Sequence, residues 1–317
     1  MSLNIVFAGT SLFSVPILQA LIESRKHRIV AVCTQPDRPA GRGRRTIQNP
    51  VRDFLAASQK INIFQPILFK EEEEREIRNL KADIMIVAAY GLFLPNKILS
   101  AYRFGCVNIH ASLLPRWRGA SPIQHTILSG DQKSGITIVQ MDERLDAGDI
   151  LAQKSTFIKK EDTTGTLCKR LATLGSRLLM NILDRIESGT TVRIIKQNTN
   201  RVTYAPKIQK KDAEIDWNDS AINLERQVRA FNPHPIAFTY FKNQPLRIWK
   251  AEALLEKALL EPGNIIRLHR KGLDVATGDG GILRIHQLQF PGKRTQIAWD
   301  FINAYWKELH PGQTVLG

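Results

Sequence analysis

Three polar side chains follow the ends of apolar segments in the middle of the chain. Asn108 and His110 stand two residues apart at the end of a predicted strand, 106–109, and Asp146 follows a second predicted strand, 135–141. An amide, an imidazole and a carboxylate can together stabilise a developing oxyanion and transfer a proton. Because open α/β sheets bind ligands at the carboxyl ends of their strands, we expect these three side chains to converge on one site.

Purely structural roles are the alternative for such residues. A histidine beside a strand is often a core or surface residue, an asparagine there often caps a turn, and acids in a glycine-containing loop can do the same. For Asp142 and Asp149 that alternative stays open. His110 differs from an isolated histidine because Asn108 and Asp146 accompany it.

The elements that position these residues begin with a β-α-β pattern. Apolar segments at 4–8 and 29–34 predict strands, and the helical spacing over 12–24 predicts a helix between them. The continuous apolar run at 84–89 indicates a strand buried on both faces. This pattern predicts a Rossmann-like, mostly parallel sheet. The first strand is followed by a single glycine, Gly9, without GxGxxG, so we expect no NAD site.

The rest of the chain suggests how it divides into domains. Leucine and isoleucine recur at helical spacing over 163–187, which should close a first domain at 1–189. The basic segment 190–206 has little apolar periodicity and is typical of a linker. Residues 207–317 follow as a second domain. Its short predicted strands at 246–251, 263–268, 272–276 and 282–288, separated by glycine turns, predict a small OB-like β-barrel.

The composition restricts the class of protein and of partner. The 45 Lys and Arg against 30 Asp and Glu give a net charge of +15, which favours a polyanionic partner. Basic clusters at 38–52 and 190–211 carry much of this charge. No apolar stretch approaches the ~20 residues that cross a bilayer, so we expect no membrane association. Neither CxxC nor HExxH occurs, so we expect no metal site, and three widely spaced cysteines indicate a reduced, cytoplasmic protein.

Eight segments carry a resemblance to a known family. They are TQPDRPAGRGRR (34–45), VAAYGLFLP (87–95), NIHASLLPRWRGASPIQ (108–124), QMDERLDAGDIL (140–151), VTYAPKI (202–208), IDWNDSA (215–221), RAFNPHP (229–235) and VATGDGGIL (275–283). With them the chain resembles the methionyl-tRNA formyltransferase family, within the wider group that takes formyl from 10-formyltetrahydrofolate. One departure is Ser11-Leu12, where the family usually has proline and an acid.

The resemblance implies transfer of formyl from 10-formyltetrahydrofolate to methionyl-initiator-tRNA, so the folate co-substrate and the charged tRNA are the expected partners. It implies that Asn108, His110 and Asp146 are catalytic. The folate contacts that it implies are Ala88, Tyr90, Gly91, Leu94, Ser112, Leu113, Leu114, Pro115 and Asp142. We expect contacts to the tRNA from Arg42, Arg44, Arg45, Lys207 and Lys210.

These residue types suit that reaction, because the substrate amine is the nucleophile and the sequence has no GxSxG elbow. Asn108 would donate to the oxyanion, and His110 would donate to the oxyanion or to the leaving nitrogen N10. Asp146 would accept a hydrogen bond from the imidazole or take the amine's proton, directly or through a water. The alternatives are a related formyltransferase acting on a small amine, such as glycinamide ribonucleotide or an amino sugar, and a non-catalytic RNA-binding protein. We expect a monomer.

Overall fold

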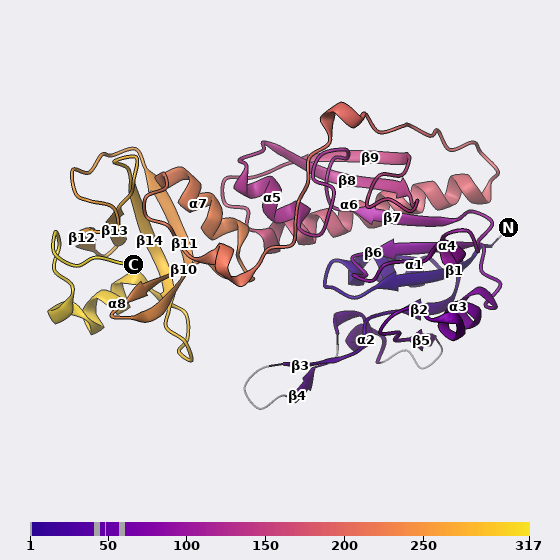
Figure 1. Ribbon diagram of the computed structural model, residues 1–317, viewed down its shortest axis with the longest axis horizontal. Helices are drawn as coiled ribbons and strands as arrows, with labels where there is room; N and C mark the ends of the chain where they lie inside the picture. The colour runs from indigo at the N-terminus through magenta and orange to yellow at the C-terminus, as the bar shows by residue number, and fades with distance from the viewer. Residues whose placement is uncertain (1, 41–44, 48, 57–60) are drawn as a thin grey trace. The chain divides into compact units, whose positions relative to one another are not determined.

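The computed structural model describes residues 2–40, 45–47, 49–56 and 61–317 (Figure 1). The chain forms two compact units. The first comprises Met1–Pro122, Lys133–Phe157 and Cys168–Pro206, and the second comprises Ile123–Gln132, Ile158–Leu167 and Lys207–Gly317. Both units are therefore built from segments that are not contiguous in the sequence.

A seven-stranded sheet forms the centre of the first unit, in the order β5-β2-β1-β6-β7-β8-β9. Its strands are β1 (Asn4–Gly9), β2 (Arg28–Cys33), β5 (Asn62–Phe64), β6 (Ile84–Ala88), β7 (Cys106–His110), β8 (Lys133–Gln140) and β9 (Ile150–Phe157). Neighbours from β5 to β7 are parallel, whereas β8 and β9 are antiparallel. The predicted Rossmann-like, mostly parallel sheet is confirmed. A separate hairpin pairs β3 (Arg38–Ala40) with β4 (Arg45–Ile47).

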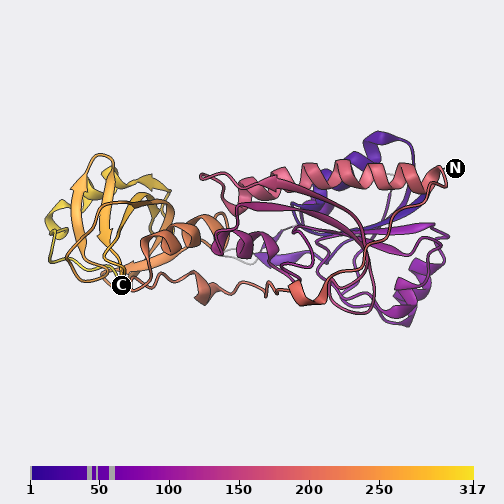
Figure 2. The same cartoon turned by 90° about the horizontal axis from the view of Figure 1, so that it is seen from above.

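Helices cover both faces of this sheet (Figure 2). The first unit contains α1 (Ser14–Ser24), α2 (Pro50–Leu55), α3 (Glu71–Arg78), α4 (Asn96–Leu99) and most of α6 (Thr164–Glu187). On one face, Ile77 of α3 and Ile98 of α4 pack into a buried cluster with Met85 and Val87 of β6. Every residue of β6 is buried, as expected for a parallel strand covered on both sides.

Residues 190–206, predicted as a linker, pack along the first unit. Ile195 exchanges two backbone hydrogen bonds of 2.9 Å with Ile150, the first residue of β9. After a short 3₁₀ helix, η1 (Thr199–Arg201), the nitrogen of Ala205 donates to the carbonyl of Arg118 at 2.7 Å. Backbone pairing rather than apolar side chains holds this segment, which explains its lack of apolar periodicity.

An antiparallel sheet forms the second unit, in the order β10-β11-β14-β13-β12 with β15 beside β14. Its strands are β10 (Phe238–Phe241), β11 (Gln244–Leu254), β12 (Ile265–His269), β13 (Gly272–Ala276), β14 (Ile282–Gln289) and β15 (Gln296–Ile297). The outer strands β12 and β10 are bridged by residues 314–317. Ile265 donates to the carbonyl of Thr314 at 2.9 Å, and Gly317 donates to that of Tyr240 at 3.1 Å. The strands and this segment thus form a ring, as a small barrel requires.

Short helices complete the second unit. They are α5 (Pro122–Leu128), α7 (Ala221–Ala230), α8 (Ala298–Ala304), η2 (Lys210–Ala213) and η3 (Trp306–Glu308). In the part of the chain that the structure describes, no helix is both long and apolar enough to span a membrane.

Asp274 on β13 is a fully buried acid in this sheet. Arg284 of the neighbouring strand β14 donates to its two carboxylate oxygens at 2.7 and 2.9 Å, and Arg267 of β12 donates at 3.0 Å. Burial by itself raises the pKa of Asp274, but the hydrogen bonds and charges of Arg284 and His269 outweigh it and hold that pKa below its ordinary value.

Candidate active site

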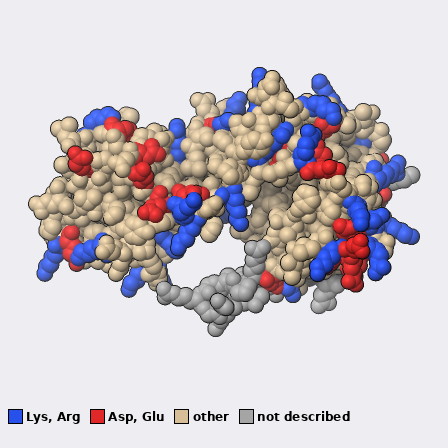
Figure 3. Space-filling view, viewed as in Figure 1, with Lys and Arg blue, Asp and Glu red and all other residues tan. Residues whose placement is uncertain are grey.

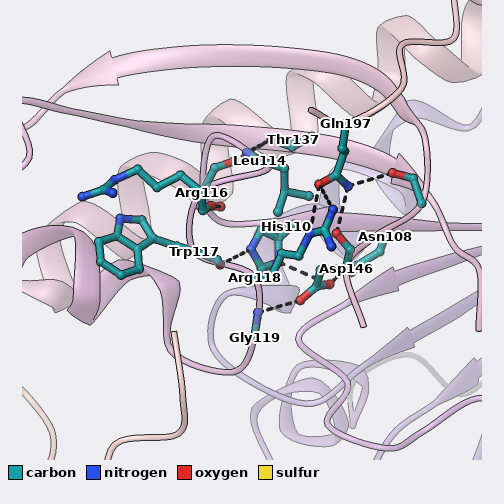
Figure 4. A network of polar contacts seen from close by, with 12 residues as sticks. Asn108, His110, Leu114, Arg116, Trp117, Arg118, Gly119, Thr137, Asp146 and Gln197 are labelled. Atoms are coloured by element: carbon teal, nitrogen blue, oxygen red, sulfur yellow. Dashed lines mark hydrogen bonds and ion pairs between the residues drawn. The ribbon is translucent and has the colours of Figure 1, made fainter. Parts of the chain in front are cut away.

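Asn108, His110 and Asp146 meet at the end of strand β7 (Figure 4). Asn108 and His110 are two residues apart on an extended strand, so both side chains point to the same face of the sheet. The Nδ2 of Asn108 donates to Oδ1 of Asp146 at 3.2 Å, and the Nδ1 of His110 lies 3.5 Å from the same oxygen. The three side chains that the sequence analysis grouped are therefore brought together.

Asp146 is held by its backbone as well as by its side chain. Its φ angle of +48° lies in the left-handed region, which residues other than glycine rarely adopt. Its second carboxylate oxygen, Oδ2, accepts a hydrogen bond of 2.9 Å from the backbone nitrogen of Gly119. Because its side chain is only 11% exposed, the carboxylate interacts with protein donors more than with water.

The second ring nitrogen of His110 fixes how the imidazole can be protonated. Nε2 lies 2.9 Å from the carbonyl oxygen of Trp117, an acceptor, so Nε2 carries a hydrogen in this arrangement. A neutral ring would then present the lone pair of Nδ1 to the carboxylate of Asp146. The imidazolium instead offers an N–H to each of its two neighbours, so both acceptors are placed to receive a hydrogen bond from the protonated ring.

An apolar pocket of about 240 Å³ opens beside these residues. Asn108 and Asp146 contribute polar atoms to its wall. The apolar part of the lining is Leu92, Phe93, Leu94, Leu99, Val139, Met141, Leu145 and Ala147. Pockets that hold whole drug-sized ligands usually measure ~300–1,000 Å³, so this one fits a single ring system.

Two of the residues predicted to contact folate line this pocket. They are Leu94, which follows strand β6, and Asp142, which follows strand β8. Tyr90 is buried below the surface, and its carbonyl oxygen accepts hydrogen bonds from Thr10 at 2.9 Å and Gln35 at 3.0 Å. The remaining predicted contacts, which do not line the pocket, are Ala88, Gly91, Ser112, Leu113, Leu114 and Pro115.

The turn Ser112–Pro115 is held by hydrogen bonds to Arg116 and to Thr137 of β8. Ser112 is buried, and its hydroxyl donates to the carbonyl of Arg116 at 2.6 Å. Thr137 of β8 donates to the carbonyl of Ser112 at 2.7 Å and accepts from the nitrogen of Leu114 at 3.0 Å. These contacts fix the backbone that leads from His110 to Trp117.

The predicted tRNA contacts lie on different parts of the chain. Arg42 and Arg44 fall outside the described residues, and Arg45 begins strand β4. Lys207 and Lys210 are exposed. Figure 3 shows Lys and Arg side chains spread over the visible face with acidic groups between them, so the net charge is not confined to one patch in that view.

Sequence analysis missed a group of residues that surround Asp146. Arg118 is buried, and its Nε and Nη2 donate to Oε1 of Gln197 at 3.1 and 2.8 Å. The Nε2 of Gln197 donates to the backbone carbonyls of Asp146 and Gly148, each at 2.8 Å. Arg118 stands inside the motif that carried the resemblance, but Gln197 lies in the segment predicted as a linker and has no sequence signal of its own.

Cys106 on β7 is the cysteine that lies nearest to Asn108 in the sequence. Burial raises the pKa of Cys106, two residues before Asn108, to about 12, so its thiol is not a nucleophile at neutral pH. One group of described residues, His27, Asp184 and Glu187, has ligand atoms within 4.8 Å of one another. The ammonium group of Lys26 already pairs with Asp184 at 2.8 Å, and we assign no metal there.

Comparisons with known proteins find relatives of the whole chain. The formyl transferase family model matches residues 3–183, and the model of the formyl transferase C-terminal domain matches 207–305. A methionyl-tRNA formyltransferase of Coxiella burnetii is 54% identical over 318 residues, with all of both chains covered. One from Hydrogenovibrio crunogenus is 49% identical over 303 residues, which cover 95% of this chain and 96% of the relative.

A solved structure shares the fold. HypX from Aquifex aeolicus, in complex with tetrahydrofolic acid, aligns with a TM-score of 0.66 and 16% identity. The alignment covers 98% of this chain and 48% of HypX. At this level of identity the likeness concerns the fold alone.

Proposed function

This chain belongs to the formyl transferase family, and from that membership we infer that it transfers the formyl group of 10-formyltetrahydrofolate to the free amino group of methionyl-initiator-tRNA. The products are formylmethionyl-tRNA, which serves translation initiation, and tetrahydrofolate. The observation that carries this inference is the meeting of an amide, an imidazole and a carboxylate beside an apolar pocket, in a chain with full-length relatives of this activity.

We propose that Asn108 stabilises the oxyanion. The amine of the charged tRNA attacks the formyl carbon, and negative charge develops on the formyl oxygen. A primary amide has two N–H donors, and the hydrogen bond to Asp146 uses one of them. The other can meet the oxyanion at the rim of the pocket, which Asn108 lines.

The reaction must also move one proton from the attacking nitrogen to the leaving nitrogen N10. Asp146 is the base that we propose for the amine's proton, directly or through a water. His110 is the acid that we propose for N10, because its ring is flanked by two acceptors that favour a proton on each nitrogen. The new C–N bond forms, the bond from the formyl carbon to N10 breaks, and the number of protons is conserved.

The apolar pocket is our proposed site for the pterin ring of the folate. Its two loops, represented by Leu94 and Asp142, support this assignment because they offer apolar contact together with polar groups at the edge. The other predicted contacts do not line this pocket, and they remain our proposed contacts to the folate: Ala88, Tyr90, Gly91, Ser112, Leu113, Leu114 and Pro115.

For the tRNA we propose contacts from Arg42, Arg44 and Arg45 of the basic cluster at 38–52 and from Lys207 and Lys210. Arginine forks suit phosphates and guanine edges, and such contacts should weaken as salt rises. We propose residues 1–189 as the catalytic domain, 190–206 as the basic linker and 207–317 as the tRNA-binding domain, a division supported by the two family matches. We also propose a monomer that acts in the cytoplasm.

A panel of acceptors tests this function. Charged initiator tRNA, uncharged tRNA, glycinamide ribonucleotide and an amino-sugar nucleotide would each be incubated with 10-formyltetrahydrofolate. We expect transfer to the charged tRNA alone, and a loss of at least ~100-fold in His110→Ala. His310→Ala, which removes an exposed histidine of the second unit, is the matched control and should retain activity.

Two results would argue against the proposal. Faster transfer to a small amine than to the charged tRNA would favour a different enzyme of the group, and no transfer to any acceptor would favour a binding protein. For the basic cluster at 38–52, Arg42→Ala should raise the KM for tRNA. A change within about twofold, or ~0.4 kcal/mol, would remove Arg42 from the interface, and Arg78→Ala on the exposed surface of α3 is its control.

A further inference from the structure

Residues 195–205, which we term the strap, contact both loops that surround His110. At one end, Ile195 pairs with Ile150 just after the loop of Asp146. At the other end, Thr203 and Ala205 pair with the loop that contains Trp117 and Arg118. The strap therefore spans the two segments that supply acceptors to the imidazole.

Gln197 occupies the middle of these contacts, and its amide orientation is determined by its partners. The guanidinium of Arg118 only donates hydrogen bonds, so the amide oxygen of Gln197 must face it. The NH₂ group then faces the carbonyls of Asp146 and Gly148, which only accept. Each polar atom of this side chain thus has partners of the correct kind.

The loop that Gln197 holds is conformationally restricted. Asp146 has a left-handed backbone, which a non-glycine residue keeps only when its surroundings stabilise it. At Gly148, a Cβ would lie 1.7 Å from the carbonyl oxygen of Gln140, so the loop also approaches β8 too closely for a side chain there. Two hydrogen bonds from one amide fix the carbonyls on both sides of Ala147.

The strap also fixes the other neighbour of His110. The nitrogen of Trp117 donates to Oγ1 of Thr203, and the nitrogen of Arg118 donates to the carbonyl of Thr203, both at 2.9 Å. Trp117 itself has a φ of +65° and presents its carbonyl to Nε2 of His110. Both acceptors of the imidazole are thereby attached to the same short segment.

We infer that Gln197 is a positioning residue for the transfer reaction: it holds the carboxylate of Asp146 against His110 through the backbone of the 146–148 loop, and Arg118 fixes its amide. This inference rests on the proposed function. Gln197 acts on the substrate only through Asp146, because its hydrogen bonds go to the loop backbone and to Arg118.

Gln197→Ala is the principal variant, and Asn200→Ala, an exposed residue of the same strap, is its matched control. We expect kcat for charged tRNA to fall roughly 10- to 100-fold in Gln197→Ala, the range produced when a reacting group shifts by up to ~1 Å. The KM values for tRNA and for 10-formyltetrahydrofolate should stay within about twofold, because Gln197 does not itself line the pocket and contacts its wall only through the backbone carbonyls of Asp146 and Gly148. Asn200→Ala should retain full activity.

Two further arms separate positioning from a general loss of structure. Gln197→Glu keeps an oxygen for Arg118 but cannot donate to the two carbonyls, so it should be as impaired as Gln197→Ala, and full activity would overturn the inference. In an Asp146→Asn background, Gln197→Ala should lower the residual single-turnover rate by less than about twofold. A second tenfold loss in that background would show an effect independent of Asp146 and would also overturn it.

Hydrogen exchange gives a readout that does not depend on catalysis. Gln197→Ala should accelerate amide exchange within residues 142–149, and Asn200→Ala should not. Unchanged exchange in that loop would overturn the positioning role even if activity fell. If the native protein formylates no charged tRNA while the exchange result holds, the proposed function fails and the structural coupling of Gln197 to Asp146 stands.

Discussion

Replacing Asp146 by asparagine removes one charge from the candidate active site while it preserves the shape of the side chain. The amide oxygen can still accept from the nitrogen of Gly119, now 2.9 Å from Oδ2. The new NH₂ group must then face Asn108 and His110, which lie 3.2 and 3.5 Å from Oδ1. The variant therefore loses the interaction between a carboxylate and a protonated imidazole, and it places two amide donors against each other.

The size of the effect on kcat follows from the distance between Nδ1 of His110 and Oδ1 of Asp146. Unit charges 3.5 Å apart interact with about 4–5 kcal/mol at an effective dielectric constant of about 20. That dielectric suits this pair because the two side chains are only 5% and 11% exposed. The NH₂ group of the new amide faces the imidazole and recovers none of this energy. A loss of about 4–5 kcal/mol in the transition state lowers kcat about 10³-fold or more.

The assay measures formylmethionyl-tRNA formed from charged initiator tRNA, with both substrates saturating. Asp149→Asn is the matched control, since Asp149 lies in the same loop but pairs with Lys196 at 2.7 Å. We expect that control to stay within about twofold of the native kcat. A kcat for Asp146→Asn within about threefold of the native value, in a folded protein, would refute the reasoning that this carboxylate serves the proton transfer.

Three further predictions follow from the same structure. Asn108→Ala should lower kcat about 10²- to 10³-fold, the usual effect of losing one oxyanion donor; single-turnover rates test this, and a loss below tenfold contradicts it. Asp274→Asn should destabilise the second unit by about 3 kcal/mol, since it leaves Arg284 without its countercharge, and thermal denaturation measures this. The folded state lowers the pKa of Asp274, so this carboxylate stabilises the fold above the unfolded pKa of about 3.9. That stabilisation is lost as the pH falls through the folded pKa. The native protein and Asp274→Asn should therefore converge in stability in acid. Cys33 and Cys106, whose burial raises each pKa to about 12, should resist a thiol reagent at pH 8 in the native state, and mass spectrometry should find rapid labelling at neither.

Much of the first unit could be predicted from the sequence because its signals are local. The apolar runs that became β1, β6, β7 and the second half of β2 are largely buried, so they stand out as hydrophobic segments. The spacing of Asn108 and His110 on one strand sufficed to place them on one side. Their convergence with Asp146 was predicted for a reason that is wrong here: β8 is antiparallel to β7, so its carboxyl end pairs with the amino end of β7. The loop after β8 is what brings Asp146 to Asn108 and His110.

Strand β9, the strap and the pocket lining left no comparable local signal in the sequence. Strand β9 is largely exposed between Gln153 and Ser155, so its sequence lacks apolar alternation. The strap is held by backbone pairing and by the side chains of Gln197 and Thr203, and polar residues in a basic segment resemble a linker. Seven of the nine predicted folate contacts do not line the pocket, because motif resemblance identifies segments and not which atoms of a segment face a cavity.

The interleaving of the two units in the sequence limits how such a gene could recombine. Thr164, at the start of α6, donates to the carbonyl of Ala230 at 2.6 Å, and Gly165 donates to that of Asn232 at 3.0 Å. Arg229 likewise donates to the carbonyl of Asp162 at 3.1 Å. After a crossover at residue 206, the second unit would thus combine residues 207–317 of one parent with segments 123–132 and 158–167 of the other. Chimeras of diverged parents should therefore have mismatched contacts within the second unit. Successful exchange of that unit requires all three segments to come from the same parent.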